Sequence, residues 1–168
     1  PTQKWFDSQL WNTLRSLDPE RPVWVEAESR KIGVVQVPEK LLARIRGSRC
    51  LRLEVPVRER VRFLIGDYPH MLAEPTALKS RLTQLTRLQS REVLQRWMDA
   101  IDAANWETLV LDLLENHYDP LYQRSMRKSY PTLDHAPVLH IESLEPPALA
   151  ASAQRIAHEY SPSAASQV

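Results

Sequence analysis

Two acidic side chains, Glu26 and Glu28, close a short apolar segment that begins at Pro22. In open α/β sheets, ligands bind beyond the carboxyl ends of the strands. Carboxylates placed there hold Mg²⁺, directly or through water, or position a nucleophile. The residues that follow add a hydroxyl and two cations: Ser29, Arg30 and Lys31. The sequence therefore predicts catalytic carboxylates beside an anion-binding group. The alternative is a rim of surface ion pairs, each worth about 1 kcal/mol at most.

A second concentration of reactive side chains lies in residues 117–125. It holds an imidazole, two phenols, a carboxylate, a guanidinium and a hydroxyl: His117, Tyr118, Asp119, Tyr122, Arg124 and Ser125. Aromatic side chains and Arg planes stack on unpaired nucleic-acid bases, and Arg pairs with phosphate. This segment is therefore predicted to bind a phosphate or a base. The alternative is a capping turn that is packed by its own tyrosines.

The remaining candidates for chemistry are weaker. Cys50, the single cysteine, lies in a predicted buried strand, where a thiol behaves as a small hydrophobe. With one cysteine no internal disulfide forms, so a reducing compartment, the cytoplasm, is expected. His135 and His140 have no further ligands at a suitable spacing, so no metal site is predicted from them.

Composition indicates a folded chain of balanced charge. Hydrophobic residues make up 43% of the 168 residues, which is enough to bury a core. The 22 basic and 21 acidic residues give a net charge of +1, which does not by itself indicate nucleic-acid binding. No apolar run is long enough to span a membrane. Arginine nevertheless concentrates in one region, at Arg44, Arg46, Arg49, Arg52, Arg58, Arg60 and Arg62. This cluster either binds phosphate or is an ordinary solvated surface.

Strands separated by helices are expected to position these residues. β-branched and alternating patterns predict strands at 22–26, 50–55 and 138–141, and apolar spacings of three and four predict helices at 4–17, 38–47 and 147–160. This order favours a parallel sheet. Between the second and third strands, residues 57–130 predict several helices, with caps at Ser90 and Asn105 and a new short helix that starts at Asp119-Pro120.

Three segments in this order resemble bacterial tRNA 2-selenouridine synthase. They are Pro-Thr-Gln-Lys-Trp-Phe at 1–6, Arg-Pro-Val-Trp-Val-Glu-Ala-Glu-Ser-Arg-Lys-Ile-Gly at 21–33, and the segment 117–125. The resemblance extends from Pro1 to about Ile156. It implies a transferase that replaces the sulfur of wobble 2-thiouridine in tRNA with selenium from selenophosphate, through an S-geranylated intermediate made from geranyl diphosphate. It thereby implies three partners: tRNA, selenophosphate and geranyl diphosphate.

The same resemblance implies a particular fold and a missing part. Members of that family have a rhodanese-like domain followed by a P-loop domain, and neither the rhodanese-like domain nor the Gly-x-x-x-x-Gly-Lys-Ser/Thr loop is present in this chain. The first residue is Pro, and there are only 3 glycines, so we expect a segment to precede Pro1. The isolated chain is then expected to be inactive, with the N-terminal rhodanese-like and P-loop region as its partner.

The resulting fold prediction is an α/β chain: a partial P-loop-NTPase-like parallel sheet with a helical insertion subdomain. We predict four parts. They are the C-terminal part of the P-loop-like domain at 1–56, the helical insertion at 57–130, the returning strand and helix at 131–160, and a disordered tail at 161–168.

The site prediction follows the same division. Catalytic roles are predicted for Glu26 and Glu28, with Mg²⁺ as a candidate ion and no covalently bound cofactor. Substrate anions are predicted to bind Ser29, Arg30, Lys31, Arg124 and Ser125. Contacts with tRNA are predicted for His117, Tyr118, Tyr122, Arg127 and Lys128. The alternative function is a non-catalytic RNA- or partner-binding module that derives from the enzyme.

Overall fold

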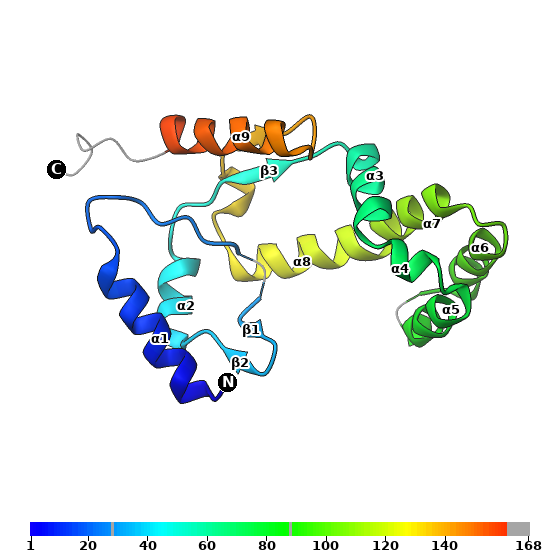
Figure 1. Cartoon of the computed structure of the whole chain (residues 1–168), viewed down its shortest axis with the longest axis horizontal. Coiled ribbons are helices and arrows are strands. Elements are labelled where there is room, and N and C mark those ends of the chain that lie inside the picture. Colours follow the sequence, from blue (N-terminus) through cyan, green and yellow to red (C-terminus); the bar gives the residue numbers. More distant parts are fainter. Residues whose placement is uncertain (28, 88, 161–168) are drawn as a thin grey trace. The chain divides into compact units, whose positions relative to one another are not determined.

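The computed structural model describes residues 1–27, 29–87 and 89–160, and the side chains of residues 86 and 87 are not among those described. Glu28 and the predicted tail 161–168 therefore lie outside the described residues. The described chain is helix-rich, with short strands (Figure 1). Its elements are α1 Gln3–Ser16, β1 Lys31–Ile32, β2 Val35–Gln36, α2 Glu39–Arg46, β3 Arg52–Glu54, α3 Val57–Asp67, α4 Pro69–Leu72, α5 Pro75–Thr83, a 3₁₀ turn Gln84–Arg87, α6 Arg91–Asp102, α7 Trp106–Leu113, a π-helical turn Leu114–Tyr118, α8 Asp119–Ser129, a 3₁₀ turn Leu133–His135, β4 Val138–His140 and α9 Pro146–Glu159.

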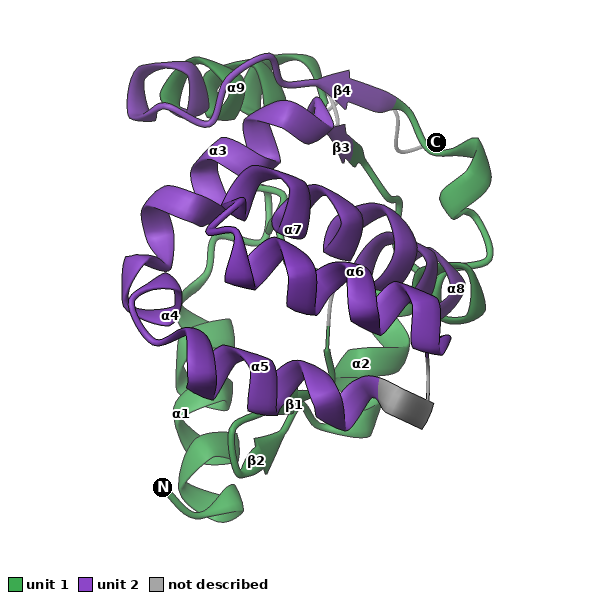
Figure 2. Ribbon diagram, turned by 90° about the vertical axis from the view of Figure 1, so that its right-hand side faces the viewer, with its two compact units in different colours: residues 1–52, 126–137, 150–168 green, residues 53–125, 138–149 purple. Residues whose placement is uncertain are grey.

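The chain divides into two compact units (Figure 2). Unit 1 contains residues 1–52, 126–137 and 150–168, and unit 2 contains residues 53–125 and 138–149. Helix α8 contains one of the division points, between Ser125 and Met126. No helix in the described ranges is long and apolar enough to cross a membrane.

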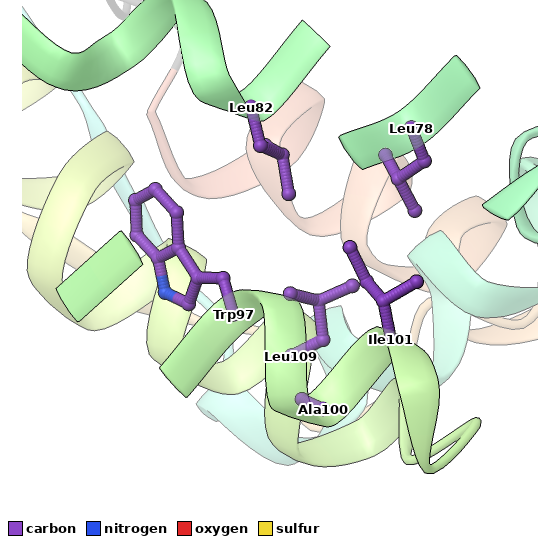
Figure 3. Packing of buried hydrophobic residues seen from close by; sticks show 6 residues of the cluster. All are labelled: Leu78, Leu82, Trp97, Ala100, Ile101 and Leu109. Carbon is purple, nitrogen blue, oxygen red and sulfur yellow. The ribbon is translucent and has the colours of Figure 1, made fainter. Parts of the chain in front are cut away.

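The main core of unit 2 is built by α5, α6 and α7. Its buried side chains come from all three helices and point toward one another: Leu78, Leu82, Trp97, Ala100, Ile101 and Leu109 (Figure 3). On α5 and α6 they are spaced by three or four residues, which places each set on one helical face. Trp97 is 1% exposed, and its Nε1–H donates to Asp112 Oδ2 at 2.6 Å. The largest core side chain thus has its polar atom paired.

Both helix caps predicted in this block are confirmed. The Ser90 side chain accepts a hydrogen bond from Val93 N at 3.3 Å at the start of α6. The Asn105 side chain accepts from Thr108 N at 3.2 Å at the start of α7. Each cap satisfies one of the amide groups that a helix leaves unpaired at its beginning.

The parallel sheet is confirmed in part, as one pair of strands. β3 and β4 form a two-stranded sheet. The hydrogen bond Arg52 N to Pro137 O, 2.9 Å, lies at one end of the pair, and Ile141 N to Glu54 O, 2.8 Å, at the other. From one bond to the next, the residue number rises on both strands, from 52 to 54 and from 137 to 141. The strands therefore run parallel, and the helical block between them is their crossover connection. Leu53 is 52% exposed, so the predicted apolar face of the strand at 50–55 is not buried.

The strand predicted at 22–26 is wrong. These residues form no regular element, and Val23, Trp24 and Val25 are each about half exposed. Backbone groups of a strand need a neighbouring strand as hydrogen-bond partner, and no described residue provides one here. A hairpin forms instead in the segment predicted to be a polar loop, where Lys31 pairs with Gln36 and Ile32 with Val35. Gly33 permits its tight turn, with φ of +59°.

Unit 1 has a much thinner core. Its described buried hydrophobic residues are few: Val35, Leu42, Met126 and Tyr130. Helix α1 is confirmed, but it has no buried residue. It is held to β2 mainly by polar contacts, because the side chain of Gln3 donates to Gln36 O at 2.8 Å and accepts from Gln36 N at 2.9 Å. The apolar pattern of α1 therefore produces a helix without producing a core.

Candidate functional site

The segment 117–125 lies on a continuous helical run, which corrects the prediction that Asp119-Pro120 caps a separate short helix. α7 passes through the π-helical turn Leu114–Tyr118 directly into α8. Asp119 N bonds to Leu114 O, a wider spacing than in an α-helix. Pro120 has no N–H to donate, so the carbonyl of Asn116 loses its helical partner. Gln89 Nε2 donates to that carbonyl at 2.9 Å, which allows the run to continue.

His117 faces inward from this turn. It is 5% exposed, and its Nδ1 lies 3.1 Å from the same Gln89 Nε2. Its ring also meets the ring of Trp97 edge to face, with centroids 6.1 Å apart. Burial of the imidazole favours a packing role over the predicted contact with tRNA. Gln89 therefore holds the turn at two points, the Asn116 carbonyl and the His117 ring.

Asp119 is paired from within unit 2 by Arg60 of α3. The guanidinium donates two hydrogen bonds of 2.7 Å each to the two carboxylate oxygens. This hydrogen bonding raises the pKa of Arg60 above its ordinary value, and desolvation by burial opposes the rise. Arg60 Nε is buried without a partner among the described residues. The Asp119 carboxylate is thus fixed and neutralised, and it holds the start of α8.

The two tyrosines remain on the surface. Tyr118 is 56% exposed and Tyr122 is 51% exposed. Tyr118 ends the π-helical turn and Tyr122 lies four residues later in the first turn of α8, so their rings project from about the same side of the helical run. The edge of the Tyr118 ring packs against His117, with centroids 4.9 Å apart. Arg124 and Ser125, one turn further along, are exposed as well. Phenol rings are suited to stacking on bases and a guanidinium to pairing with phosphate. Arg124 follows Tyr122 by two residues, so it projects from a different side of α8 than the two rings.

The two basic residues that follow belong to unit 1 and differ in their partners. Arg127 Nε donates to Asp134 Oδ1 at 3.0 Å, so part of its charge is already compensated. Lys128 is exposed in the same final turn of α8.

The acidic and basic group near the hairpin is arranged differently from the prediction. Glu26 is exposed and does not lie at the end of a strand, and its predicted partner Glu28 is outside the described residues. Ser29 Oγ accepts from Lys31 N at 3.1 Å, and the Arg30 guanidinium donates to the side chain of Gln36. These contacts serve the hairpin of unit 1. Arg124 and Ser125, the other predicted anion-binding residues, belong to unit 2.

The Mg²⁺ expected beside Glu26 and Glu28 stays a prediction, because Glu28 lies outside the described residues. Nowhere in residues 1–27, 29–87 and 89–160 do three or more His, Cys, Asp or Glu side chains gather as a cation site. We therefore assign no step to a metal ion.

Comparison with known families supplies the decisive observation. The family model of the tRNA 2-selenouridine synthase AAA domain matches residues 1–101, more than half of the chain. The chain belongs to this family. In this 2-selenouridine synthase family member, the match includes the motif at 21–33. The segment 117–125 lies beyond the matched residues. No curated protein and no solved structure matches the chain.

Sequence reasoning missed the two side chains that shape the start of α8, Arg60 and Gln89. Both lie far away in sequence, 59 residues before Asp119 and 28 residues before His117. One local signal was present. A proline inside a helical pattern leaves a carbonyl without its partner, and this predicts that some polar side chain must approach it.

Proposed function

We propose that this chain is part of a tRNA 2-selenouridine synthase, which replaces the sulfur of wobble 2-thiouridine with selenium from selenophosphate. The reaction passes through an S-geranylated intermediate formed from geranyl diphosphate. The family match over residues 1–101 carries this proposal, because the matched domain is that of tRNA 2-selenouridine synthases. An N-terminal rhodanese-like and P-loop region completes the enzyme, which works in the cytoplasm.

In this proposal the exposed face of α8 contacts the tRNA. Tyr118 and Tyr122 stack on unpaired bases of the anticodon loop, because an exposed phenol ring offers a sequence-tolerant π surface. Arg124 and Ser125 bind an anionic group, either the tRNA backbone or the phosphates of a co-substrate. The Arg60–Asp119 pair and Gln89 hold α8 in place from inside.

The hairpin of unit 1 supplies the second set of proposed contacts. Ser29, Arg30 and Lys31 bind the anionic co-substrates, selenophosphate or geranyl diphosphate. Glu26 and Glu28 act on the substrate as carboxylates. Support for these roles is the motif at 21–33, which lies inside the family match.

Binding of 2-thiouridine tRNA by the chain tests the α8 face. We expect the double substitution Tyr118→Ala, Tyr122→Ala to weaken binding at least tenfold, since each stacked base contributes about 1–3 kcal/mol. The matching Phe substitutions keep the rings and should bind normally. Tyr68→Ala, which removes a 43% exposed tyrosine elsewhere in unit 2, is the control. Equal losses for Tyr68→Ala and for the double variant would contradict the stacking role.

Turnover distinguishes the enzyme from a non-catalytic RNA-binding module. The chain alone should bind tRNA without selenation or geranylation. Joined to a rhodanese-like and P-loop region of the same protein, it should support both steps. If Arg124 binds the phosphates of a co-substrate, Arg124→Ala should lower turnover and leave tRNA affinity nearly unchanged. If it binds the tRNA backbone, Arg124→Ala should weaken tRNA binding and make it less salt-dependent. Binding without turnover in the joined protein would favour the non-catalytic module instead.

A further inference from the structure

The net charge of +1 conceals two units of opposite charge. Unit 1 contains 13 Arg and Lys against 8 Asp and Glu, which gives +5. Unit 2 contains 9 Arg and Lys against 13 Asp and Glu, which gives −4. A polyanion such as RNA is attracted by the positive potential of unit 1 and repelled by the negative potential of unit 2.

The positive charge of unit 1 is concentrated at and after α2. Residues 40–53 include no Asp or Glu but five cations, three of which form what we call the α2 arginine patch: Arg44, Arg46 and Arg49. All three are exposed, and none of their guanidinium groups forms a salt bridge or side-chain hydrogen bond with another described residue. In unit 2, by contrast, Arg60, Lys79 and Arg96 each pair with an aspartate.

The patch is attached to the small core of unit 1. Burial raises the pKa of Tyr130, which is 4% exposed, and the positive charge of Arg46 opposes this rise. The end of α2 is therefore close enough to this buried side chain for its charge to be felt there, while the three guanidinium groups of the patch are exposed. Helix stability explains the patch only in part. Cations in the last turn favour a helix C-terminus, which accounts for Arg44 and Arg46 but not for Arg49, three residues beyond the helix.

We propose that the α2 arginine patch binds backbone phosphates of the RNA substrate. Arg offers a planar fork of donors that matches phosphate oxygens. Contacts of this kind position the RNA without reading its sequence, and they release counterions. The patch therefore supplies salt-dependent affinity, and its role is separate from stacking on α8. The proposal rests on the proposed function to the extent that tRNA is the polyanion.

The salt dependence of tRNA binding tests the proposal. Affinity of the full chain for an unmodified tRNA transcript is measured between 50 and 300 mM KCl by filter binding. For Arg44→Gln, Arg46→Gln, Arg49→Gln together, the slope of log K against log salt should become shallower by about 2 to 3 units. The triple Lys variant keeps the charge and should retain most of the slope. The control, Arg58→Gln, Arg81→Gln, Arg91→Gln, removes the same charge from exposed positions of unit 2 and should change the slope by less than one unit.

The outcomes separate a failure of the arginine patch from a failure of the proposed function. Equal slope changes in the two Gln triples, with folding verified by circular dichroism, would overturn the patch and leave the proposed function intact. If the unsubstituted chain does not bind tRNA even at 50 mM KCl, the proposed function and the patch both fail. Sedimentation with vesicles of phosphatidylcholine and phosphatidylserine is the remaining arm. Vesicle binding that requires the patch, without tRNA binding, would assign the patch to an anionic membrane surface instead.

Discussion

A tryptophan is buried in unit 2, and another is exposed in unit 1. Trp97 of unit 2 is 1% exposed at the centre of three helices, whereas Trp11 of unit 1 is 62% exposed on a helix that buries nothing. Both helices have apolar residues at helical spacing. The difference lies in what packs against them. Helix α6 has α5 and α7 as neighbours, whereas α1 meets β2 through two hydrogen bonds between the Gln3 side chain and the backbone of Gln36. Periodicity creates an apolar face, and only neighbouring elements bury it.

The largest expected effect compares these two tryptophans. Trp97→Ala should lower the free energy of unfolding of unit 2 by about 3–5 kcal/mol, since it leaves a cavity in the core and removes the hydrogen bond to Asp112. Trp11→Ala should change stability by less than about 0.5 kcal/mol, as an exposed substitution does. Urea unfolding followed by circular dichroism measures both. Similar losses for the two variants would mean that unit 1 is packed more tightly than its exposure indicates.

A smaller effect concerns the ion pair that holds α8. Arg60→Ala should destabilise the chain by about 1–3 kcal/mol, because it removes two charge-assisted hydrogen bonds to a partly buried carboxylate. Arg62→Ala removes an exposed ion pair with Glu59 and should cost about 0–1 kcal/mol. A double-mutant cycle of Arg60→Ala with Asp119→Ala isolates the pair. A coupling energy near zero would show that the pair does not hold the helix.

The smallest effect is confined to high pH and to unit 1. Burial raises the pKa of Tyr130, and the charge of Arg46 opposes this rise. Above about pH 10, where an unfolded tyrosine ionises, the unfolded chain loses this proton first, so stability falls as pH rises. Tyr130→Phe should make this fall shallower between pH 9 and 11. A Tyr130→Phe variant whose stability falls as steeply over this range as that of the unsubstituted chain would refute the assignment.

Features encoded by neighbouring residues were predicted correctly. Ser90 and Asn105 cap their helices because a side-chain oxygen reaches an amide only three residues away. The hairpin was missed because its pattern is short and polar, even though Gly33 was a signal for a turn. The strand at 22–26 was predicted wrongly because Val and Trp favour strands only where a partner strand exists.

For the candidate site, the sequence supplied the side chains and not their surroundings. His117 is buried, whereas Tyr118 and Tyr122 of the same six-residue stretch are exposed. This difference depends on which side of the turn faces Gln89 and Trp97. Nothing adjacent in the sequence indicates that Arg60 meets Asp119. The division of the chain into 1–56, 57–130 and 131–160 stays a prediction, as do the roles of Glu26 and Glu28.

The sequence by itself determined the helices, their caps, the parallel pairing of strands around a helical crossover, and the family, because each depends on spacing or motif along the chain. Only the tertiary structure decided which side chains are paired and which face solvent. Pro120 illustrates the reason. Its missing N–H is visible in the sequence, but the group that satisfies the freed carbonyl of Asn116 comes from Gln89, 27 residues earlier, and only folding brings the two together.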